Sequence, residues 1–146
     1  MSERVKATVS ALIQRNGEYL MVKNAKDGLW SPPAGKIEHN EMPQIAIERE
    51  CREEIGTEIN ILGITGFYYF TSSHGNWISN TSFLARLNGK PKIVNPEAIS
   101  EIEWMNLEKI AELNSHKKVR GSNLYLIRDY QENRTTYALE ILKRLN

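Results

Sequence analysis

The sequence predicts one domain in which strands and helices are mixed, of the α/β or α+β class. Apolar and polar residues alternate over residues 5–13, which is the period of a half-buried strand, and strand-like runs recur further along the chain. Over residues 42–55 the apolar residues repeat every four positions instead, as they do in a helix. A chain of 146 residues with 40% apolar residues has the size of one domain, so we expect residues 1–146 to fold together.

The beginning of the chain predicts a hairpin followed by an irregular loop. An Asn-Gly turn at residues 16–17 separates the strand over 5–13 from a second β-prone run over 19–22. Residues 29–35 cannot continue a regular element, because the consecutive prolines at 32–33 fix φ and remove two backbone donors.

A helix and a second group of strands come next. Pro43 suits the first turn of the helix over 42–55, and Gly56 can end it. Further strands are expected over 59–64, 67–71, 77–87 and 102–105, with a turn over 72–76, and further helices over 107–113, 123–130 and 137–145.

The balance of charge argues against large polyanionic partners. Lys plus Arg number 19 and Asp plus Glu 18, so no global positive field draws the chain onto long nucleic acid or an anionic membrane. No stretch reaches the roughly 20 apolar residues that span a bilayer, and residues 1–6 lack the apolar core of a signal peptide. We therefore expect a soluble cytoplasmic protein. The single cysteine, Cys51, has the spacing of apolar neighbours and is expected to pack in the core.

Three carboxylates gather on one side of the helix over 42–55. Glu50, Glu53 and Glu54 are spaced i, i+3 and i+4, so they project close together. Like charges at this spacing destabilise a helix by about 0.2–0.5 kcal/mol per pair. A hard divalent cation such as Mg²⁺ offsets the repulsion, because it prefers oxygen ligands and combines carboxylates with substrate phosphates. Acids on a surface helix are otherwise commonly just solvated, so the surrounding residues decide between the two interpretations.

A longer pattern surrounds these acids. Residues 35–57 fit G-x5-E-x7-R-E-U-x-E-E-x-G-U, in which U is a bulky apolar residue. On this pattern the chain resembles the Nudix hydrolase family, whose signature has that form, with Thr57 as a departure at the last position. The fixed positions that match are Gly35, Glu41, Arg49, Glu50, Glu53, Glu54 and Gly56.

The resemblance extends beyond the motif. Residues 30–35, W-S-P-P-A-G, look like the segment that leads into it, with Ala34 where many members have glycine. The order of strands around the helix suits the Nudix fold, an α/β/α sandwich with a mixed central sheet. The resemblance thus implies a single Nudix hydrolase domain.

The resemblance also implies roles for the acids. Glu50, Glu53 and Glu54 would be the catalytic carboxylates that bind Mg²⁺ or Mn²⁺, with one of them also orienting or deprotonating the attacking water. Many relatives recruit one more acid from further along the chain, and of Glu97 and Glu101 we favour Glu101 as that metal ligand.

Neighbouring residues would hold the site in shape. The backbone carbonyl of Ala34 is an expected further metal ligand. Arg49 and Glu41 would pair and fix the loop against the helix, a structural role that a bidentate guanidinium suits. Gly35 and Gly56 are the structural glycines of the motif.

The implied activity is divalent-metal-dependent hydrolysis of a phosphoanhydride bond in a nucleoside diphosphate linked to another group, X. The expected partner is therefore a small nucleotide-like diphosphate. A non-catalytic Nudix-like sensor of a nucleotide or metabolite is the alternative, although such modules often lose acids that this chain keeps. A pyrophosphohydrolase acting on RNA ends is a further alternative. The identity of X, the number of metals and the oligomeric state, a homodimer included, stay open.

Residues outside the motif have two interpretations each. His74 is either an acid–base group or a solvated turn residue. The aromatic residues at 68–70, with Trp77, either stack on a nucleobase or pack in the core. The basic run over 117–120 either meets a substrate phosphate or forms a solvated turn.

Overall fold

A mixed sheet organises the part of the chain that the structure describes, residues 4–72 and 74–146 of a computed structural model. Its strands are β1 (Lys6–Arg15), β2 (Glu18–Asn24), β3 (Trp30–Ser31), β4 (Ala34–Lys36), β5 (Ile59–Thr71), β6 (Trp77–Leu87) and β7 (Ile99–Asn106). The helices are α1 (Pro43–Ile55), α2 (Leu107–Ser115) and α3 (Asn123–Asn133), with a short 3₁₀ turn, η1 (Leu139–Ile141).

Strand β1 connects the two halves of the sheet. It pairs in parallel with β6, from Lys6 opposite Ile78 to Ile13 opposite Ala85, and β6 pairs antiparallel with β5. Strand β1 also pairs with β4 and, at its C-terminal end, with β2, which itself pairs with β3 and β7. The order along the sheet is β3-β2-β1-β6-β5, so the expected mixed sheet is confirmed.

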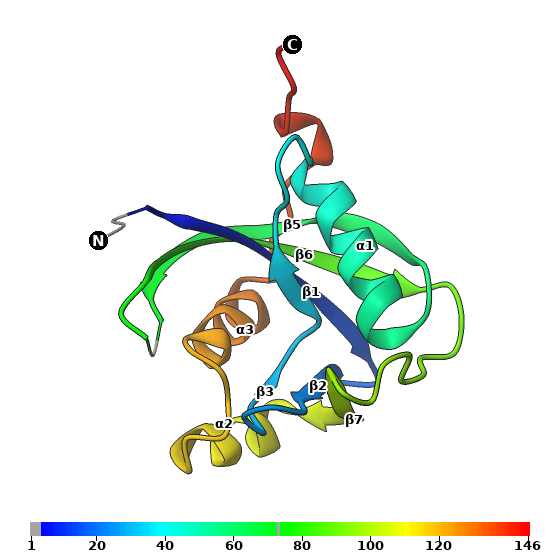
Figure 1. Ribbon diagram of the computed structural model, residues 1–146, viewed down its shortest axis with the longest axis vertical. Coiled ribbons are helices and arrows are strands. Elements are labelled where there is room, and N and C mark those ends of the chain that lie inside the picture. Colours follow the sequence, from blue (N-terminus) through cyan, green and yellow to red (C-terminus); the bar gives the residue numbers. More distant parts are fainter. Residues whose placement is uncertain (1–3, 73) are drawn as a thin grey trace.

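Helices cover both faces of the sheet (Figure 1). On one face, α1 packs against apolar residues of β1, β5 and β6, and its buried residues are Ala46, Ile47, Cys51 and Ile55. On the other face, Ile110 of α2 and Ile127 of α3 pack with residues of β2 and β7. The expected α/β/α sandwich is therefore confirmed, and Cys51 lies in the core as predicted.

The ends of α1 follow from its sequence. Met42 is the extended residue before the helix, and Pro43 occupies its first turn, where a missing N–H costs nothing. Gly56 ends the helix at φ 64°, a left-handed conformation that favours glycine. The expected helix thus begins one residue later than predicted.

Several strands differ in extent from the prediction. The expected strands over 59–64 and 67–71 form one strand, β5, in which two register shifts mark bulges. The expected strand over 102–105 is the middle of β7. The expected loop over 29–35 contains two short strands, β3 and β4, on either side of the two prolines, whose lack of N–H donors interrupts the pairing. Helices α2 and α3 confirm the predictions and extend them at their C-terminal ends.

The predicted helix over 137–145 is wrong. Tyr137 pairs with Ile64 of β5, each backbone N–H donating to the carbonyl of the other at 2.8 Å. Gly63 makes room for this segment, since a Cβ there would lie 2.8 Å from the Cβ of Thr136. Beyond Tyr137 only the η1 turn is helical. Pairing with the bulged strand therefore overrides the helical spacing of the apolar residues.

Two expectations fall partly outside the described residues. The turn over 72–76 includes residue 73, and the signal-peptide argument includes residues 1–3. Within the described chain, no helix combines the length and apolarity needed to cross a bilayer.

Candidate active site

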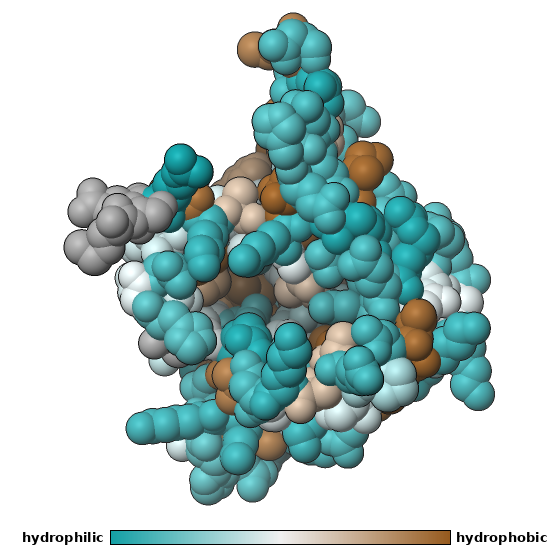
Figure 2. All heavy atoms as spheres, in the orientation of Figure 1, coloured by the Kyte–Doolittle hydropathy of each residue, from teal (hydrophilic) through white to brown (hydrophobic). Residues whose placement is uncertain are grey.

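One cleft of about 420 Å³ opens beside the C-terminal part of α1. Figure 2 shows the hollow in this face of the molecule, with apolar surface inside it and hydrophilic side chains around it. Its walls come from β1, β4, α1, the β5–β6 hairpin and the segment that leads into α3. Residues at its edge and floor include Lys6, Thr8, Ala34, Gly35, Lys36, Glu54, Phe70, His74, Asn80, Arg120 and Asn123.

Glu54 is the acid of the motif that reaches this cleft directly. Its Oε1 accepts a hydrogen bond of 3.0 Å from the backbone N–H of Ala34, which ties the end of α1 to β4. Burial raises the pKa of the Glu54 carboxyl to about 8, against the opposing effect of that hydrogen bond. Without a cation, this carboxyl is therefore largely protonated at neutral pH.

Glu50 lies behind the loop that opens the motif. A Cβ added to Gly35 would stand 2.0 Å from the Cδ of Glu50, so only glycine allows the carboxylate to approach the loop this closely. The Glu50 side chain is 13% exposed. Desolvation raises its pKa, partly offset by the hydrogen bond from Arg49. Gly35 is thus required for space and not for an unusual φ.

Arg49 joins the loop to the helix. Its Nε and Nη2 donate to the two carboxylate oxygens of Glu41 at 2.8 and 3.0 Å, and Nη2 also donates to the carbonyl of Lys36 at 2.9 Å. Its Nη1 donates to Glu50 at 2.8 Å and to Glu53 at 3.3 Å. The pair of Arg49 and Glu41 expected from the sequence is present, and this hydrogen bonding lowers the pKa of Glu41.

The donor set fits a hard divalent cation by its chemistry. Glu50, Glu53 and Glu54 supply carboxylate oxygens on one side of α1, and burial raises the pKa of Glu50 and Glu54, so a bound cation would favour their ionised forms. Within residues 4–72 and 74–146, no three acidic, histidine or cysteine side chains already stand together as a metal-holding group. The three acids of α1 stand apart because Glu50 and Glu53 accept hydrogen bonds from Arg49, whereas Glu54 accepts one from the backbone N–H of Ala34.

The acids suggested from further along the chain lie elsewhere. Glu101 belongs to β7, where its side chain is 56% exposed and forms an ion pair of 3.2 Å with Lys23 of β2. Glu97 is exposed in the loop before β7. Neither lines the cleft. The structure brings Ala34, Gly35 and Glu54 together there, and it does not bring Glu101 to them.

Several cleft residues could not be recognised from sequence patterns. Asn80 is buried and is fixed by hydrogen bonds with Ser10 and Thr8 of the neighbouring strand. The alternation along β1 and β6 indicates that Thr8 and Asn80 share a face, but not that this face lines a cleft. Lys6 and Lys36 also reach the cleft, and nothing in their spacing marks them.

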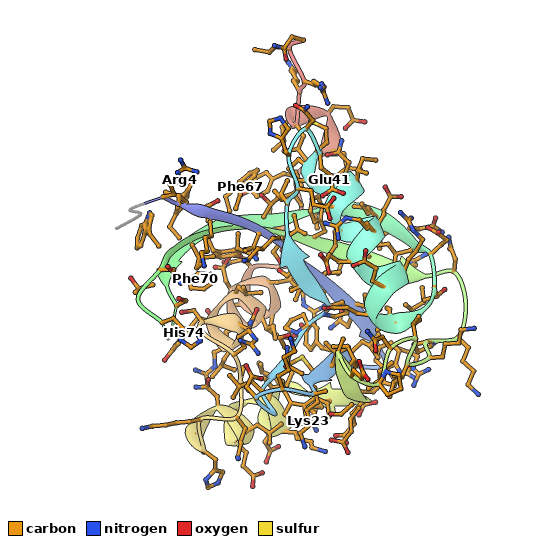
Figure 3. All side chains as sticks on the ribbon, in the orientation of Figure 1. Arg4, Lys23, Glu41, Phe67, Phe70 and His74 are labelled. Carbon is orange, nitrogen blue, oxygen red and sulfur yellow. The ribbon has the colours of Figure 1, made fainter. Side chains whose placement is uncertain are left out.

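The aromatic run divides between two surfaces. Phe70 and His74, which Figure 3 labels on the β5–β6 hairpin, line the cleft. Tyr69 and Trp77 instead stack on each other with ring centres 6.3 Å apart, and both are exposed. Tyr68 donates a hydrogen bond to Asp129 of α3. Neither the core nor the base-stacking interpretation therefore holds for the run as a whole.

Comparison with known proteins identifies the family. The sequence matches the NUDIX domain over residues 3–129, which is most of the chain. The chain belongs to the Nudix family. Its acids on α1 and the loop from Gly35 to Glu41 are the Nudix motif expected from the sequence.

Relatives and solved structures agree with this assignment. A MutT-like protein of Streptomyces ambofaciens is 24% identical over 122 residues, covering 84% of this chain and 72% of the relative. The NAD-capped RNA hydrolase NudC of Pseudomonas putida is 24% identical and covers 97% of this chain, which spans half the length of that relative. A solved Nudix hydrolase from Nitrosomonas europaea matches with a TM-score of 0.87 and 26% identity, covering 97% of this chain and 98% of that structure. The protein is thus a Nudix-type pyrophosphohydrolase with the Nudix fold.

Proposed function

We propose that this Nudix enzyme hydrolyses a phosphoanhydride bond in a nucleoside diphosphate linked to another group, with Mg²⁺ or Mn²⁺ held by Glu50, Glu53 and Glu54. The observation that carries the proposal is the position of Glu54, whose carboxyl faces the cleft from the end of α1. Glu50 and Glu53 lie within a turn of it on the same helix.

The shape and charge of the cleft support a small phosphorylated substrate. Lys6, Lys36 and Arg120 line it together with the aromatic ring of Phe70, so cationic and apolar groups face the same space. A nucleotide presents both an anionic and an apolar part. A cleft of about 420 Å³ also has the size of a small-molecule site.

The residues of the chain have separate tasks in this reaction. Glu54 faces the substrate and, once deprotonated, can accept a proton from the attacking water or hold the metal. Arg49 bonded to Glu41 keeps the loop against α1, so that the backbone of Ala34 and Gly35 stays beside the acids. A bound divalent cation would supply charge neutralisation at the phosphoryl oxygens.

The metal ligands that we propose are Glu50, Glu53, Glu54 and the carbonyl of Ala34. Glu53 is 58% exposed, so it can turn from Arg49 without disturbing the core. The ion pair of Glu101 with Lys23 and its place outside the cleft argue for leaving that residue out of the set.

The test is a substrate panel with Mg²⁺ or Mn²⁺ and identification of the products, which shows the phosphorus that is attacked. The panel contains nucleoside triphosphates, nucleotide sugars, dinucleotide cofactors and capped dinucleotides. With the best substrate, Glu53→Gln and Glu54→Gln should lower kcat by roughly 10²–10⁴-fold. Glutamine at position 54 can still accept the hydrogen bond from Ala34, so the fold should persist.

Glu48→Gln is the matched control, because Glu48 lies on the same helix and does not line the cleft. It should retain wild-type turnover. Wild-type activity in both glutamine variants would refute the role of the acids. Nucleotide binding without any turnover by the wild-type protein would point to a sensor instead.

A further inference from the structure

Arg120 stands at the cleft on a segment that is fixed to the sheet. Its backbone N–H donates to the carbonyl of Trp30 at 2.8 Å, and the N–H of Trp30 donates to the carbonyl of Lys118 at the same distance. These bonds form a parallel bridge between Val119 and Trp30, the first residue of β3. The carbonyl of Arg120 also accepts a hydrogen bond from the side chain of Asn123 at 2.8 Å. The backbone of Arg120 is therefore held at the cleft wall from both sides.

The guanidinium of Arg120 is anchored at one nitrogen. Its Nη2 donates to Oδ2 of Asp27, which lies in the β2–β3 loop. The other oxygen of Asp27, Oδ1, accepts from the backbone N–H of Leu29 at 3.1 Å, so the carboxylate is itself held in place. Desolvation acts to raise the pKa of Asp27, but the hydrogen bonds from Leu29 and Arg120 outweigh it and leave the pKa lowered. Asp27 is therefore ionised at neutral pH.

The rest of the guanidinium is available to a ligand. An arginine carries five N–H donors, and only Nη2 of Arg120 has an acceptor among the described residues. The side chain is 37% exposed and lines the cleft together with Glu54. Its neighbours in the basic run, Lys117 and Lys118, do not line the cleft. Of that run, Arg120 is thus the residue placed to meet a substrate.

We propose that Arg120 binds two oxygens of one phosphate of the diphosphate substrate through the N–H donors that Asp27 leaves open, and that Asp27 is a positioning residue that holds the guanidinium in the orientation to do so. The inference rests on the proposed function and extends it with a substrate-binding pair outside the Nudix motif. A guanidinium suits this task because its planar fork matches two oxygens of one phosphate.

The probe is methylenediphosphonate, a diphosphate mimic whose bridging carbon resists hydrolysis, titrated calorimetrically at pH 7 with saturating Mg²⁺. Arg120→Gln should weaken its binding by roughly 10- to 100-fold, the effect of losing hydrogen bonds to a charged group. Arg120→Lys keeps the positive charge but loses the planar fork, so its affinity for the diphosphonate should lie between those of the wild type and Arg120→Gln. Lys118→Gln removes a charge two residues away and should bind as the wild type does.

The positioning role of Asp27 is tested by the same binding measurement in Asp27 variants. Asp27→Ala removes both anchoring oxygens and should weaken binding of the diphosphonate by roughly three- to tenfold, less than the loss of Arg120 itself. Asp27→Asn keeps an acceptor for Arg120 and should recover most of that loss. In the Arg120→Gln background, Asp27→Ala should have no further effect on affinity.

Each contrary outcome overturns the inference and not the proposed function. An unchanged dissociation constant in Arg120→Gln, an equal loss in Lys118→Gln, or no binding by the wild-type protein would exclude Arg120 as the phosphate ligand. Tighter binding in Asp27→Ala would show that Asp27 competes with the substrate for Arg120. Turnover of the nucleotide panel by the wild-type enzyme is measured separately and decides the proposed function alone.

Discussion

Arg49 and Glu41 form a bidentate ion pair in which Nε and Nη2 of the guanidinium each donate to a different carboxylate oxygen, at 2.8 and 3.0 Å. Both side chains are largely buried, at 18% and 11% exposure. The pair joins the loop before α1 to the helix itself. Nη1 of the same guanidinium donates to Glu50 and Glu53. The positions of Glu50 and Glu53 therefore depend on one arginine.

The pair makes a prediction about stability. Arg49→Lys keeps the charge but loses the planar fork, so it should lower the free energy of unfolding by about 1–3 kcal/mol. Urea denaturation measures this. Arg52→Lys is the control, because Arg52 lies on the same helix and its ion pair with Glu58 is exposed. That control should change stability by about 0–1 kcal/mol, and equal losses in the two variants would contradict the bracing role.

The close approach of Gly35 and Glu50 leads to a second prediction, on stability and activity. A methyl group at position 35 would collide with the Glu50 carboxylate, so Gly35→Ala should displace the loop or the acid and lower both stability and kcat. Adding Glu50→Ala removes the colliding group. In that background Gly35→Ala should cost much less stability than it does alone, while activity stays low. Additive losses of stability in a double-mutant cycle would argue against the collision.

The raised pKa of Glu54 predicts a pH dependence of stability in metal-free protein. The carboxyl ionises near 4.5 in the unfolded chain and near 8 in the folded one, so between these values the folded state holds the extra proton. Its contribution is fully present below about pH 4.5 and is lost as the pH rises through about 8. Urea denaturation in EDTA from pH 5 to 9 should show the wild type losing stability relative to Glu54→Gln. A constant difference between the two proteins would refute the raised pKa.

The burial of Cys51 predicts that its thiol reacts slowly in the folded protein. Its side chain is fully buried in the core beneath α1, and burial raises the pKa of the thiol, so little thiolate forms and no reagent reaches it. A disulfide reagent such as DTNB should therefore react with one thiol per chain in urea and hardly at all in the folded protein. Rapid labelling under native conditions would show that α1 separates from the sheet.

Local spacing explains which features could be predicted. The helix over 42–55 and the grouping of its acids depend on residues within a few turns of one another, and the structure confirms the helix. The helix predicted over 137–145 is absent because Tyr137 pairs with Ile64, a partner far away in the sequence. The same limit applies to Glu101, whose distance from the cleft depends on how β7 pairs with β2.

The mixed fold class, the Nudix motif and the helix that carries Glu50, Glu53 and Glu54 follow from the sequence alone, because these features depend on patterns among neighbouring residues. The set of side chains around Glu54 depends instead on contacts between distant segments. Arg120 reaches the cleft through a bridge to Trp30 and an ion pair with Asp27, contacts that join distant segments and leave no periodic signal. Strand pairing and side-chain packing, and not local spacing, therefore shape the substrate-facing part of the site.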